Sequence, residues 1–341
     1  MATLTVAGVT EVVIDSGLPR PLLPPRGGRS RVAILTQPAA TDIALDVAGH
    51  LRGEEVSCEV IGLPDREEAK TLPVAGSVYE ALARFGLARD DTVIGVGGGS
   101  VTDLAGYVAG TWLRGVEAVH VPTTLLGAID ASIGGKTGVN IGGKNLVGVF
   151  WHPTRVVIDV ERLSRLPSYL IREGMAEAYK AGLIGNAELA ETIEKSGLDS
   201  DLEKVITKSV GVKADIVDRD ITERGDRAFL NFGHTIGHAI EYASSLSHGE
   251  SVGLGMVAAV RISEKLAGFA HADRVIDAIS RLGLPTQVEG LELARVIDLL
   301  SRDKKRDAGG VRMVLLKEIE SPLLVHVDRT DIEIGLAAIG F

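Results

Sequence analysis

Three histidines in the second half of the sequence have the spacing of a metal site. His234 and His238 are four residues apart, so they would share one face of a helix, and His248 follows ten residues later. Upstream, Glu177 and Lys180 are three residues apart and would also share a helical face. One carboxylate and two imidazoles, with a coordination position left open, suit catalytic zinc or another divalent ion. Ordinary helix packing and capping would explain the same histidines, so the spacing leaves both interpretations open.

A glycine-rich segment indicates an anion site. Gly97-Gly-Gly-Ser-Val-Thr-Asp103 directly follows an apolar run that ends at Val96, and a helix could begin near Val101. Backbone without side chains lets N–H groups approach a phosphate, and the helix dipole adds partial positive charge. The dinucleotide motif GxGxxG is incomplete, because Thr102 occupies its third glycine position. A phosphate or dinucleotide site and a purely structural turn both fit the segment.

Three further segments place hydroxyl groups or lysines on turns. They are Pro122-Thr-Thr124, Gly134-Gly-Lys-Thr137 and Gly142-Gly-Lys-Asn145. A lysine after paired glycines indicates binding of phosphate or carboxylate. A Walker A motif would need a glycine five residues before its Gly-Lys, where this chain has Ile129 and Asp130, which argues against an ATPase or kinase. A metalloprotease of the zincin class is excluded because Thr235, not Glu, follows the first histidine.

Charged residues around the histidines could contribute to a substrate site. Glu223, Arg227 and Asn231 are spaced by four and would line one face of a helix, although a loop fits equally because a glycine lies within the stretch. Lys213 precedes them, and Asp303-Lys-Lys-Arg306 forms a charge run near the end of the chain. A salt-bridged surface helix and a solvated charge run are the ordinary explanations of such patterns. The spacing alone therefore does not identify a site here.

Short apolar segments alternate with helical patterns over the first 160 residues. The expected strands are Val32–Leu35, Cys58–Ile61, Thr92–Val96, Ala118–Val121 and Val156–Asp159. The helices expected between them are Thr41–Leu51, Val74–Phe85 and Val101–Gly110. This alternation predicts an α/β domain with a doubly wound parallel sheet.

Helical patterns dominate after Leu166-Pro167. They cover Ile171–Ile184, Asp201–Asp218, Thr235–Ser244, Val252–Leu266 and Ala272–Leu282. We therefore expect two domains, an α/β domain of residues 1–165 and an all-α domain of residues 166–341.

Composition limits the partners and the compartment. The 341 residues carry a net charge of −10 and contain no block rich in Lys and Arg, which argues against an electrostatic nucleic-acid binder. The single cysteine, Cys58, cannot form an intrachain disulfide and so suits a reducing compartment. The first residues lack a signal-peptide pattern, and no apolar run approaches the ~20 residues that span a bilayer. We expect a soluble, cytoplasmic protein without a membrane partner.

Several motifs occur in the order that is typical of one enzyme family. They are Gly97-Gly-Gly-x-x-x-Asp103, Arg114-Gly115, Pro122-Thr-Thr-Leu-Leu126, Asp130-x-Ser-x-Gly-Gly-Lys136-Thr, Lys144-Asn145, Gly174-x-x-Glu177-x-x-Lys180, Arg227-Ala-x-Leu-Asn231-x-Gly-His234-Thr-x-Gly-His238-Ala-x-Glu241, His248-Gly-Glu250 and Asp303-Lys-Lys305. Through them the chain resembles the 3-dehydroquinate synthases, which belong to the sugar-phosphate cyclases. The resemblance implies an NAD-binding α/β domain followed by an all-α metal-binding domain, and a homodimer. It also implies conversion of 3-deoxy-D-arabino-heptulosonate 7-phosphate to 3-dehydroquinate and phosphate in the shikimate pathway, with NAD⁺ and Zn²⁺ or Co²⁺.

The resemblance also assigns roles to matching positions. The metal ligands would be Glu177, His234 and His248, which makes His238 an acid/base or hydrogen-bonding group instead of a ligand. The catalytic residues would be Lys136, Lys180, Lys213, Glu223, Arg227, Asn231 and His238. The substrate would be bound by Arg114 of a neighbouring subunit and by Asp130, Lys136, Lys144, Asn145, Lys213, Arg227, Asn231, His238, Lys304 and Lys305. The cofactor would be bound by Asp65, Glu67, Lys70, Gly98, Gly99, Ser100, Val101, Thr102, Asp103, Thr123, Thr124, Lys136 and Lys144.

The chain departs from the family pattern by substitutions in two places, and its segments Lys136–Lys144 and His234–His248 are both slightly short. Arg165 and Tyr169-Leu170 stand where the family usually has Thr and Arg-Glu, and Ile221-Thr222 replaces a Glu-Arg pair. None of these departures removes a residue with a direct catalytic role. Three other functions are kept as alternatives. They are a sister cyclase acting on a different sugar such as sedoheptulose 7-phosphate, an NAD-dependent polyol dehydrogenase, and a non-catalytic binder of metal and nucleotide.

Overall fold

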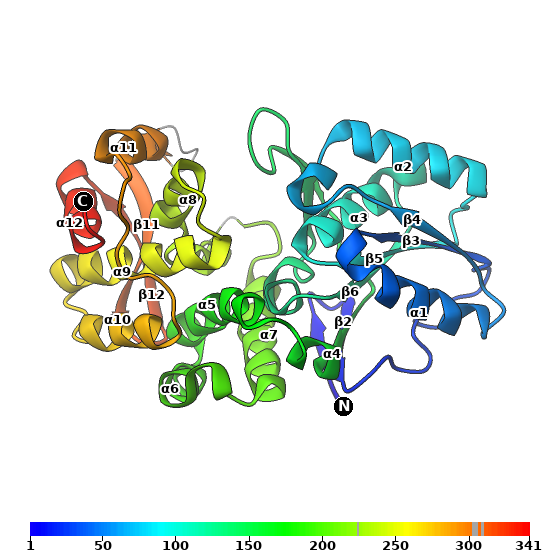
Figure 1. Cartoon of the computed structure of the whole chain (residues 1–341), viewed down its shortest axis with the longest axis horizontal. Coiled ribbons are helices and arrows are strands. Elements are labelled where there is room, and N and C mark those ends of the chain that lie inside the picture. The colour runs from blue at the N-terminus through cyan, green and yellow to red at the C-terminus, as the bar shows by residue number, and fades with distance from the viewer. Residues whose placement is uncertain (224, 302–305, 308–309) are drawn as a thin grey trace. The chain divides into compact units, whose positions relative to one another are not determined.

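The chain divides into two compact units in a computed structural model of all 341 residues. The structure describes residues 1–223, 225–301, 306–307 and 310–341. The N-terminal unit comprises Met1–Pro167 and Lys213–Asp218, and the C-terminal unit comprises Ser168–Val212 and Arg219–Phe341 (Figure 1). None of the helices in the described ranges is long and apolar enough to cross a bilayer.

A seven-stranded sheet forms the centre of the N-terminal unit. Its strands lie in the order β1-β2-β9-β6-β5-β3-β4, and every neighbouring pair is parallel except β1 with β2. Their bounds are β1 (Ala2–Val6), β2 (Thr10–Asp15), β3 (Arg31–Thr36), β4 (Ser57–Gly62), β5 (Thr92–Gly97), β6 (Glu117–Pro122) and β9 (Arg155–Asp159). The predicted parallel sheet is confirmed, and β1 and β2 add two strands at one edge.

Helices cover both faces of this sheet because successive strand residues point in opposite directions. Ala33, Leu35 and Val93 pack into one core with α2 (Leu72–Phe85) and α3 (Gly99–Thr111). Val32, Ile34 and Ile94 pack into a second core with α1 (Thr41–Arg52). Both faces are therefore buried, as the continuous apolar strand sequences predict. The remaining elements of this unit are β7 (Lys136–Val139), β8 (Val147–Phe150), α4 (Val160–Ser164), the 3-10 helices η1 (Pro38–Ala40), η2 (Arg66–Ala69) and η3 (Trp112–Arg114), and the π-helical turn η4 (Gly127–Ala131).

The C-terminal unit is mainly helical. Its helices are α5 (Ser168–Gly185), α6 (Ala187–Ser196), α7 (Leu202–Arg219), α8 (His234–Ala243), α9 (His248–Ala267), α10 (Ala272–Arg281), α11 (Leu293–Ser301) and α12 (Arg329–Ala338), with the 3-10 helices η5 (Gly197–Asp199) and η6 (Asp226–Asn231). The long helix α9 buries 13 of its 20 residues and packs against α5, α8, α10 and α12. The last turns of α7, Lys213–Asp218, count with the N-terminal unit.

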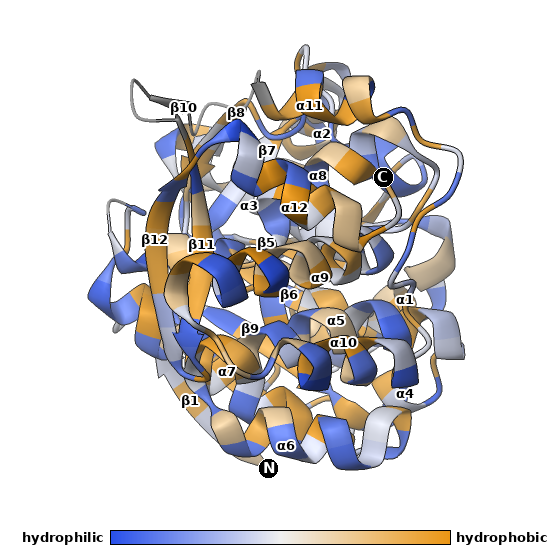
Figure 2. Ribbon diagram, turned by 90° about the vertical axis from the view of Figure 1, so that its left-hand side faces the viewer, coloured by the Kyte–Doolittle hydropathy of each residue, from blue (hydrophilic) through white to orange (hydrophobic). Residues whose placement is uncertain are grey.

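The helical character expected of this unit is confirmed, but the unit is not all-α. It also contains an antiparallel sheet of β10 (Arg306–Asp307), β11 (Gly310–Glu318) and β12 (Ser321–Val327). Hydrophobic residues, orange in Figure 2, predominate in β11 and β12. Residues Met313, Leu315 and Leu316 are buried where β11 packs on α9, so the sheet covers an apolar face that helices alone would leave exposed.

Candidate metal centre and cofactor segments

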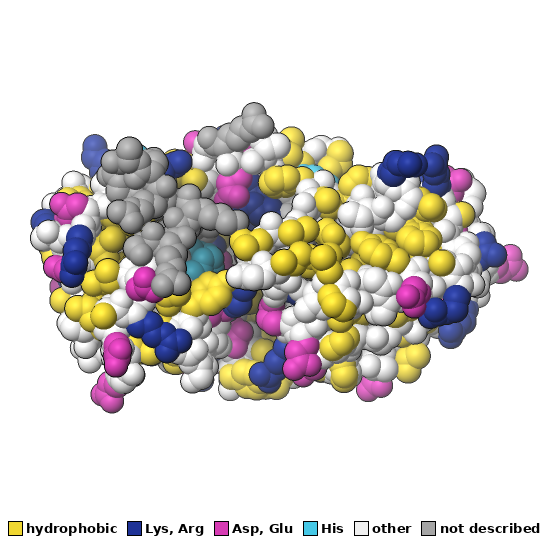
Figure 3. Space-filling view, turned by 90° about the horizontal axis from the view of Figure 1, so that it is seen from above, with side chains coloured by type: hydrophobic (Ala, Val, Ile, Leu, Met, Phe, Trp, Pro, Cys, Tyr) yellow, Lys and Arg dark blue, Asp and Glu magenta, His cyan; other side chains and the backbone are white. Residues whose placement is uncertain are grey.

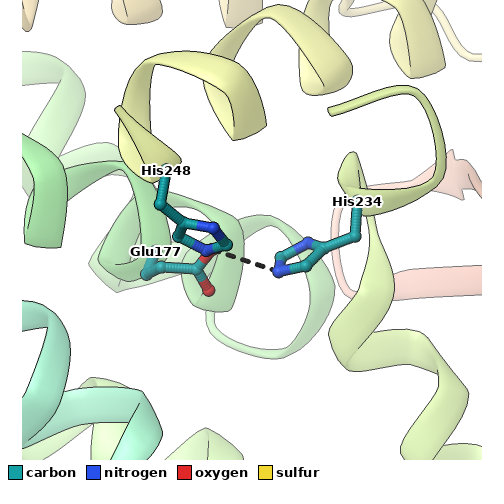
Figure 4. Close-up of side chains that lie close together, drawn as sticks. All are labelled: Glu177, His234 and His248. Atoms are coloured by element: carbon teal, nitrogen blue, oxygen red, sulfur yellow. Dashed lines mark ion pairs between the residues drawn. The ribbon is translucent and has the colours of Figure 1, made fainter. Parts of the chain in front are cut away.

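Glu177, His234 and His248 converge within the C-terminal unit. Glu177 lies in the middle of α5, and the two histidines are the first residues of α8 and α9 (Figure 4). Glu177 Oε1 is 3.4 Å from His234 Nε2 and 3.6 Å from His248 Nε2. All three ligand atoms lie within 4.8 Å of one another. Three helices that are distant in sequence thus bring together the carboxylate and the two imidazoles.

Local sequence features fix the starts of the two histidine-bearing helices. Ser247 and Glu250 form a capping box at the start of α9, in which Glu250 accepts a hydrogen bond from the Ser247 N–H at 2.8 Å. Gly233 precedes α8 with φ +77°, and a Cβ there would lie 2.7 Å from a side-chain atom of Met256. The glycine is therefore required both for its left-handed backbone and for the close approach of α8 to α9.

Hydrogen bonds at the Nδ1 atoms orient both imidazoles. His234 Nδ1 lies 3.1 Å from the carbonyl oxygen of Phe232, and His248 Nδ1 lies 3.3 Å from Glu241 Oε2. With an N–H donated from each Nδ1, both Nε2 atoms would be available to bind a cation that also contacts Glu177. Ligands on tetrahedral zinc, with bonds near 2.0–2.1 Å, lie about 3.3 Å apart. The donor set, its spacing and its outer hydrogen bonds therefore fit a divalent ion.

Charges around Glu177 keep its carboxylate ionised. Burial alone would raise the pKa of Glu177, but Lys180, which contacts it, and the two histidines hold that pKa well below its usual range. Burial and the neighbouring Lys180 lower the pKa of His234, which keeps it neutral. Burial also opposes the charged form of His248, but hydrogen bonds to Glu177 and Glu241 raise its pKa to about 10. Glu177 and Glu241 thus stabilise a positive charge at His248, and a divalent ion bound at Nε2 would take the place of the Nε2 proton.

His238 lies beside the three candidate ligands. Its ring centroid is 5.1 Å from that of His234 and 6.0 Å from that of His248. His238, Glu241 and His248 form a second group whose ligand atoms lie within 4.8 Å of one another. We favour the set with Glu177, because Glu241 already accepts the Nδ1 hydrogen bond of His248 and because Glu177 is almost fully buried.

The segment with Glu223, Arg227 and Asn231 is neither a regular helix nor an open loop. Residues Asp226–Asn231 form the 3-10 helix η6, and Glu223 has a left-handed backbone with φ +57°. The Asn231 side-chain amide donates to Glu223 Oε1 at 3.2 Å. Arg227 is only 1% exposed and donates from NH1 to the carbonyl oxygen of Ile221 at 2.7 Å. The structure thus brings the Glu223 and Asn231 side chains together through a turn that spacing by four does not predict.

The glycine-rich segment forms the strand-to-helix turn that was predicted for it. Strand β5 ends at Gly97, and α3 begins at Gly99. A Cβ on Gly97 would lie 2.4 Å from Val101 Cγ2, so only glycine allows the helix to pack this closely on the strand. The first N–H groups of α3 have no intrahelical acceptor and make the turn suitable for a phosphate. Thr123 joins the same edge by donating its backbone N–H to the carbonyl oxygen of Gly97 at 2.9 Å.

Other predicted cofactor residues surround this turn. The ammonium of Lys70 is 2.6 Å from Asp103 Oδ2. Burial raises the pKa of Asp103 more than the charge of Lys70 lowers it. Thr124 accepts a hydrogen bond from Gly127 N at 3.0 Å, and Ser100 donates to Gln37 Oε1 at 3.3 Å. Gln37 was not among the predicted site residues, because a lone glutamine before a proline carries no recognisable sequence signal.

The predicted substrate residues of the N-terminal unit occupy its turns and loops. Lys213 donates to the Asp130 carbonyl oxygen at 2.5 Å and also contacts the Asp130 carboxylate. Lys136 begins β7, and Lys144 with Asn145 lies in the loop between β7 and β8. Arg114 ends η3 with φ +68°. The predicted residues Lys304 and Lys305 lie outside the described residues.

The comparisons with known proteins agree over nearly the whole chain. Sequence models of the N-terminal and C-terminal parts of 3-dehydroquinate synthase match residues 60–173 and 174–306. A 3-dehydroquinate synthase from Corynebacterium jeikeium is 39% identical over 325 residues, which cover 92% of this chain and 88% of that protein. The chain belongs to the 3-dehydroquinate synthase family. Membership of this family confirms the resemblance inferred from the motifs.

Two solved structures of other cyclases share the fold of this family. A 2-deoxy-scyllo-inosose synthase in complex with carbaglucose-6-phosphate, NAD⁺ and Co²⁺ aligns with a TM-score of 0.90 at 26% identity, covering 99% of this chain and all of that one. A 2-epi-5-epi-valiolone synthase from Streptomyces hygroscopicus, with NAD⁺ and Zn²⁺ bound, aligns with a TM-score of 0.86 at 27% identity over 96% of each chain. Both neighbours therefore bind the dinucleotide together with a divalent metal.

Proposed function

We propose that the chain converts 3-deoxy-D-arabino-heptulosonate 7-phosphate to 3-dehydroquinate and phosphate, as a carbon–oxygen lyase of the shikimate pathway in the cytoplasm. The observation that carries this proposal is the convergence of Glu177, His234 and His248 in a chain of the 3-dehydroquinate synthase family. The chain is 39% identical to a relative named 3-dehydroquinate synthase, but 26% and 27% identical to the two cyclases with other names. The higher identity supports the heptulosonate phosphate as substrate over the substrates of those two cyclases.

The proposed cofactors are NAD⁺ and a zinc or cobalt ion. Glu177, His234 and His248 would hold the metal, while Lys70, Asp103 and the turn at Gly97–Gly99 would hold the dinucleotide. When bound, the metal supplies a Lewis acid that lowers the pKa of a substrate hydroxyl, and NAD⁺ supplies a reversible hydride acceptor.

Fixed positive charges would bind the two anionic groups of the substrate. The side chains proposed for its carboxylate, hydroxyls and phosphate are Lys136, Lys144, Asn145, Lys213, Arg227, Asn231 and His238, with Lys304, Lys305 and the acids Asp130 and Glu223. The contacts of Lys213 with Asp130 fix the ammonium in place before substrate arrives. The Arg227 guanidinium is likewise fixed by the hydrogen bond that it donates to the Ile221 carbonyl oxygen. Preorganised cations stabilise the negative charge that develops as the phosphate leaves.

Proton transfers fall to the groups nearest the metal ligands. Lys180 contacts Glu177 and keeps it ionised, so that the carboxylate stays able to bind a cation. His238 packs beside His234 and is proposed to exchange a proton with a substrate hydroxyl. During elimination the carbon–oxygen bond to phosphate breaks, a carbon–carbon double bond forms, and the phosphate oxygens accept the departing proton.

A homodimer is the proposed assembly, with Arg114 reaching the phosphate in the neighbouring subunit. Arg114 follows Leu113, which is 40% exposed, and both have left-handed backbones. The adjacent strand β8 exposes Val147 and Phe150, and Phe150 is 49% exposed. Figure 3 shows hydrophobic side chains gathered on one face of the N-terminal unit. Exposed apolar residues on one unit, together with an exposed-turn arginine, are features that protein interfaces use.

Phosphate release from two sugars tests the proposed substrate. We expect turnover of 3-deoxy-D-arabino-heptulosonate 7-phosphate and none of sedoheptulose 7-phosphate, because the cationic side chains suit a substrate carboxylate. Turnover of the second sugar alone would identify a sister cyclase. Because the hydride returns to the product, absorbance at the NADH band should not rise with turnover, and a stoichiometric rise would identify a polyol dehydrogenase.

A further inference from the structure

Two segments of the N-terminal unit that are distant in sequence are joined by hydrogen bonds. The first is Asp65–Lys70, called the cofactor segment because it carries predicted NAD⁺ contacts. The second is Asn140–Asn145, called the substrate loop because it carries the predicted substrate residues Lys144 and Asn145, although Lys144 is also a predicted cofactor contact. Both belong to the same compact unit, so their contacts are internal to it.

Asn140 uses three polar groups to make this connection. Its backbone N–H donates to the carbonyl oxygen of Lys70 at 2.7 Å. Its side-chain amide donates to Glu67 Oε2 at 2.8 Å. Its side-chain oxygen accepts the backbone N–H of Asn145 at 2.9 Å. A side chain that both donates and accepts is required, which an amide provides and a carboxylate does not.

Lys70 completes the connection from the other side. Its ammonium contacts Asp103 Oδ2 and Asn145 Oδ1, each at 2.6 Å, and its side chain is only 5% exposed. Asn145 has φ +54°, a left-handed conformation that asparagine tolerates better than most residues. The backbone turn that positions Lys144 is therefore held by contacts with the cofactor segment.

We propose that Asn140 is a positioning residue that couples NAD⁺ binding at the cofactor segment to the conformation of the substrate loop. The inference rests on the proposed function, since that function assigns NAD⁺ and the substrate to these two segments. A dinucleotide that contacts Glu67 or Lys70 stabilises the partners of Asn140 and Asn145, and so stabilises the loop. Because coupling between sites is reciprocal, substrate bound at the loop strengthens NAD⁺ binding by the same factor.

Tryptic cleavage after Lys144 measures the loop without any catalytic step. We expect saturating NAD⁺ to slow the release of the peptide that ends at Lys144 by about five-fold or more in the unmodified protein. In Asn140→Asp, where the new carboxylate faces Glu67, NAD⁺ should change this rate by less than about two-fold. Asn186→Asp is the matched control, because aspartate caps α6 as well as asparagine does.

Steady-state kinetics provide the second measurement. Asn140→Asp should raise the KM for the heptulosonate phosphate about ten-fold while kcat falls less than three-fold, since the loop is displaced and the catalytic groups are retained. Equal protection by NAD⁺ in the unmodified protein and in Asn140→Asp would overturn the inference. Absence of turnover in the unmodified protein, with the proteolysis results as expected, would overturn the proposed substrate and leave the coupling of NAD⁺ to the loop supported.

Discussion

The candidate metal centre and the substrate loop are built in opposite ways. Glu177, His234 and His248 project from three packed helices, and each histidine is oriented by a hydrogen bond at Nδ1. The substrate loop and Arg114 lie on turns that include left-handed residues, and hydrogen bonds between side chains hold the loop. The metal ligands are thus preorganised by packing, while the anion-binding groups depend on a few polar contacts that ligands can reinforce.

Removing one metal ligand is the largest perturbation of the packed region. His234→Ala should lose the metal and reduce activity by at least about 1,000-fold, because several kcal/mol of transition-state stabilisation disappear with the Lewis acid. Metal content and phosphate release are measured together on the purified variant. His271→Ala, at a half-exposed histidine of the same unit, is the control and should keep both. Full metal content in His234→Ala would contradict the assignment of this ligand.

A buried histidine tests how tightly the N-terminal unit is packed beneath its loops. His120 on β6 is fully buried, and burial lowers its pKa to about 4, although a hydrogen bond with the Ser132 carbonyl opposes this. His120 in the unfolded chain therefore binds a proton near pH 6.5, whereas in the folded chain it stays neutral down to about pH 4. The free energy of unfolding therefore falls as the pH drops from about 6.5 to 4. Protonation of His120 in the unfolded chain should lower the free energy of unfolding by about 3 kcal/mol over that range. Urea titrations of the unmodified protein and His120→Gln should diverge accordingly, and parallel pH profiles would contradict the expectation.

A substitution at Glu241 tests whether the hydrogen bond that orients His248 contributes to metal affinity. Glu241→Gln should weaken metal binding 10- to 100-fold, about the range that is typical of groups that support a metal ligand, while the fold is retained. Competition with a chelator measures the affinity. Glu264→Gln on the exposed side of α9 serves as the control. Unchanged affinity in Glu241→Gln would show that packing alone orients the imidazole.

Replacement of Arg114 has the smallest expected effect on activity, and it tests the anion-binding groups that lie on turns. Arg114→Ala should raise the substrate KM about ten-fold, as loss of one charged contact to phosphate implies. In a 1:1 mixture assayed well below the KM, where Arg114→Ala alone keeps about a tenth of full activity, mixed dimers of Arg114→Ala and His234→Ala subunits should recover about a quarter of it, because each heterodimer contains one complete site. Failure of the mixture to exceed either variant alone would contradict a role for Arg114 in the neighbouring subunit.

Much of the N-terminal fold was predictable because its determinants are local. Each predicted parallel strand is a short and mostly apolar segment, and Gly97 marks the turn into α3. The strands β11 and β12 were missed, because their burial depends on packing against α9, which no short window of sequence reports. Strands β1 and β2 were also missed. Strand β1 lies at the edge of the sheet and pairs with β2 alone, so its place in the sheet depends on that pairing.

The site was only partly predictable from spacing. The interval of four residues favours pairing of His234 with His238, whereas the turn between α8 and α9 brings His248 to His234. Motif resemblance, and not periodicity, selected His248 as a ligand. Asn140 and Gln37 act through contacts with residues far away in sequence, so neither could be identified before the fold was known.

Phosphate release with and without a chelator tests the central claim most directly. The measurement uses the NAD⁺-loaded protein and 3-deoxy-D-arabino-heptulosonate 7-phosphate, with metal content determined at each step. Chelation should abolish release, and added Zn²⁺ or Co²⁺ should restore it. Release at the full rate from protein shown to be free of metal would contradict the role given to Glu177, His234 and His248.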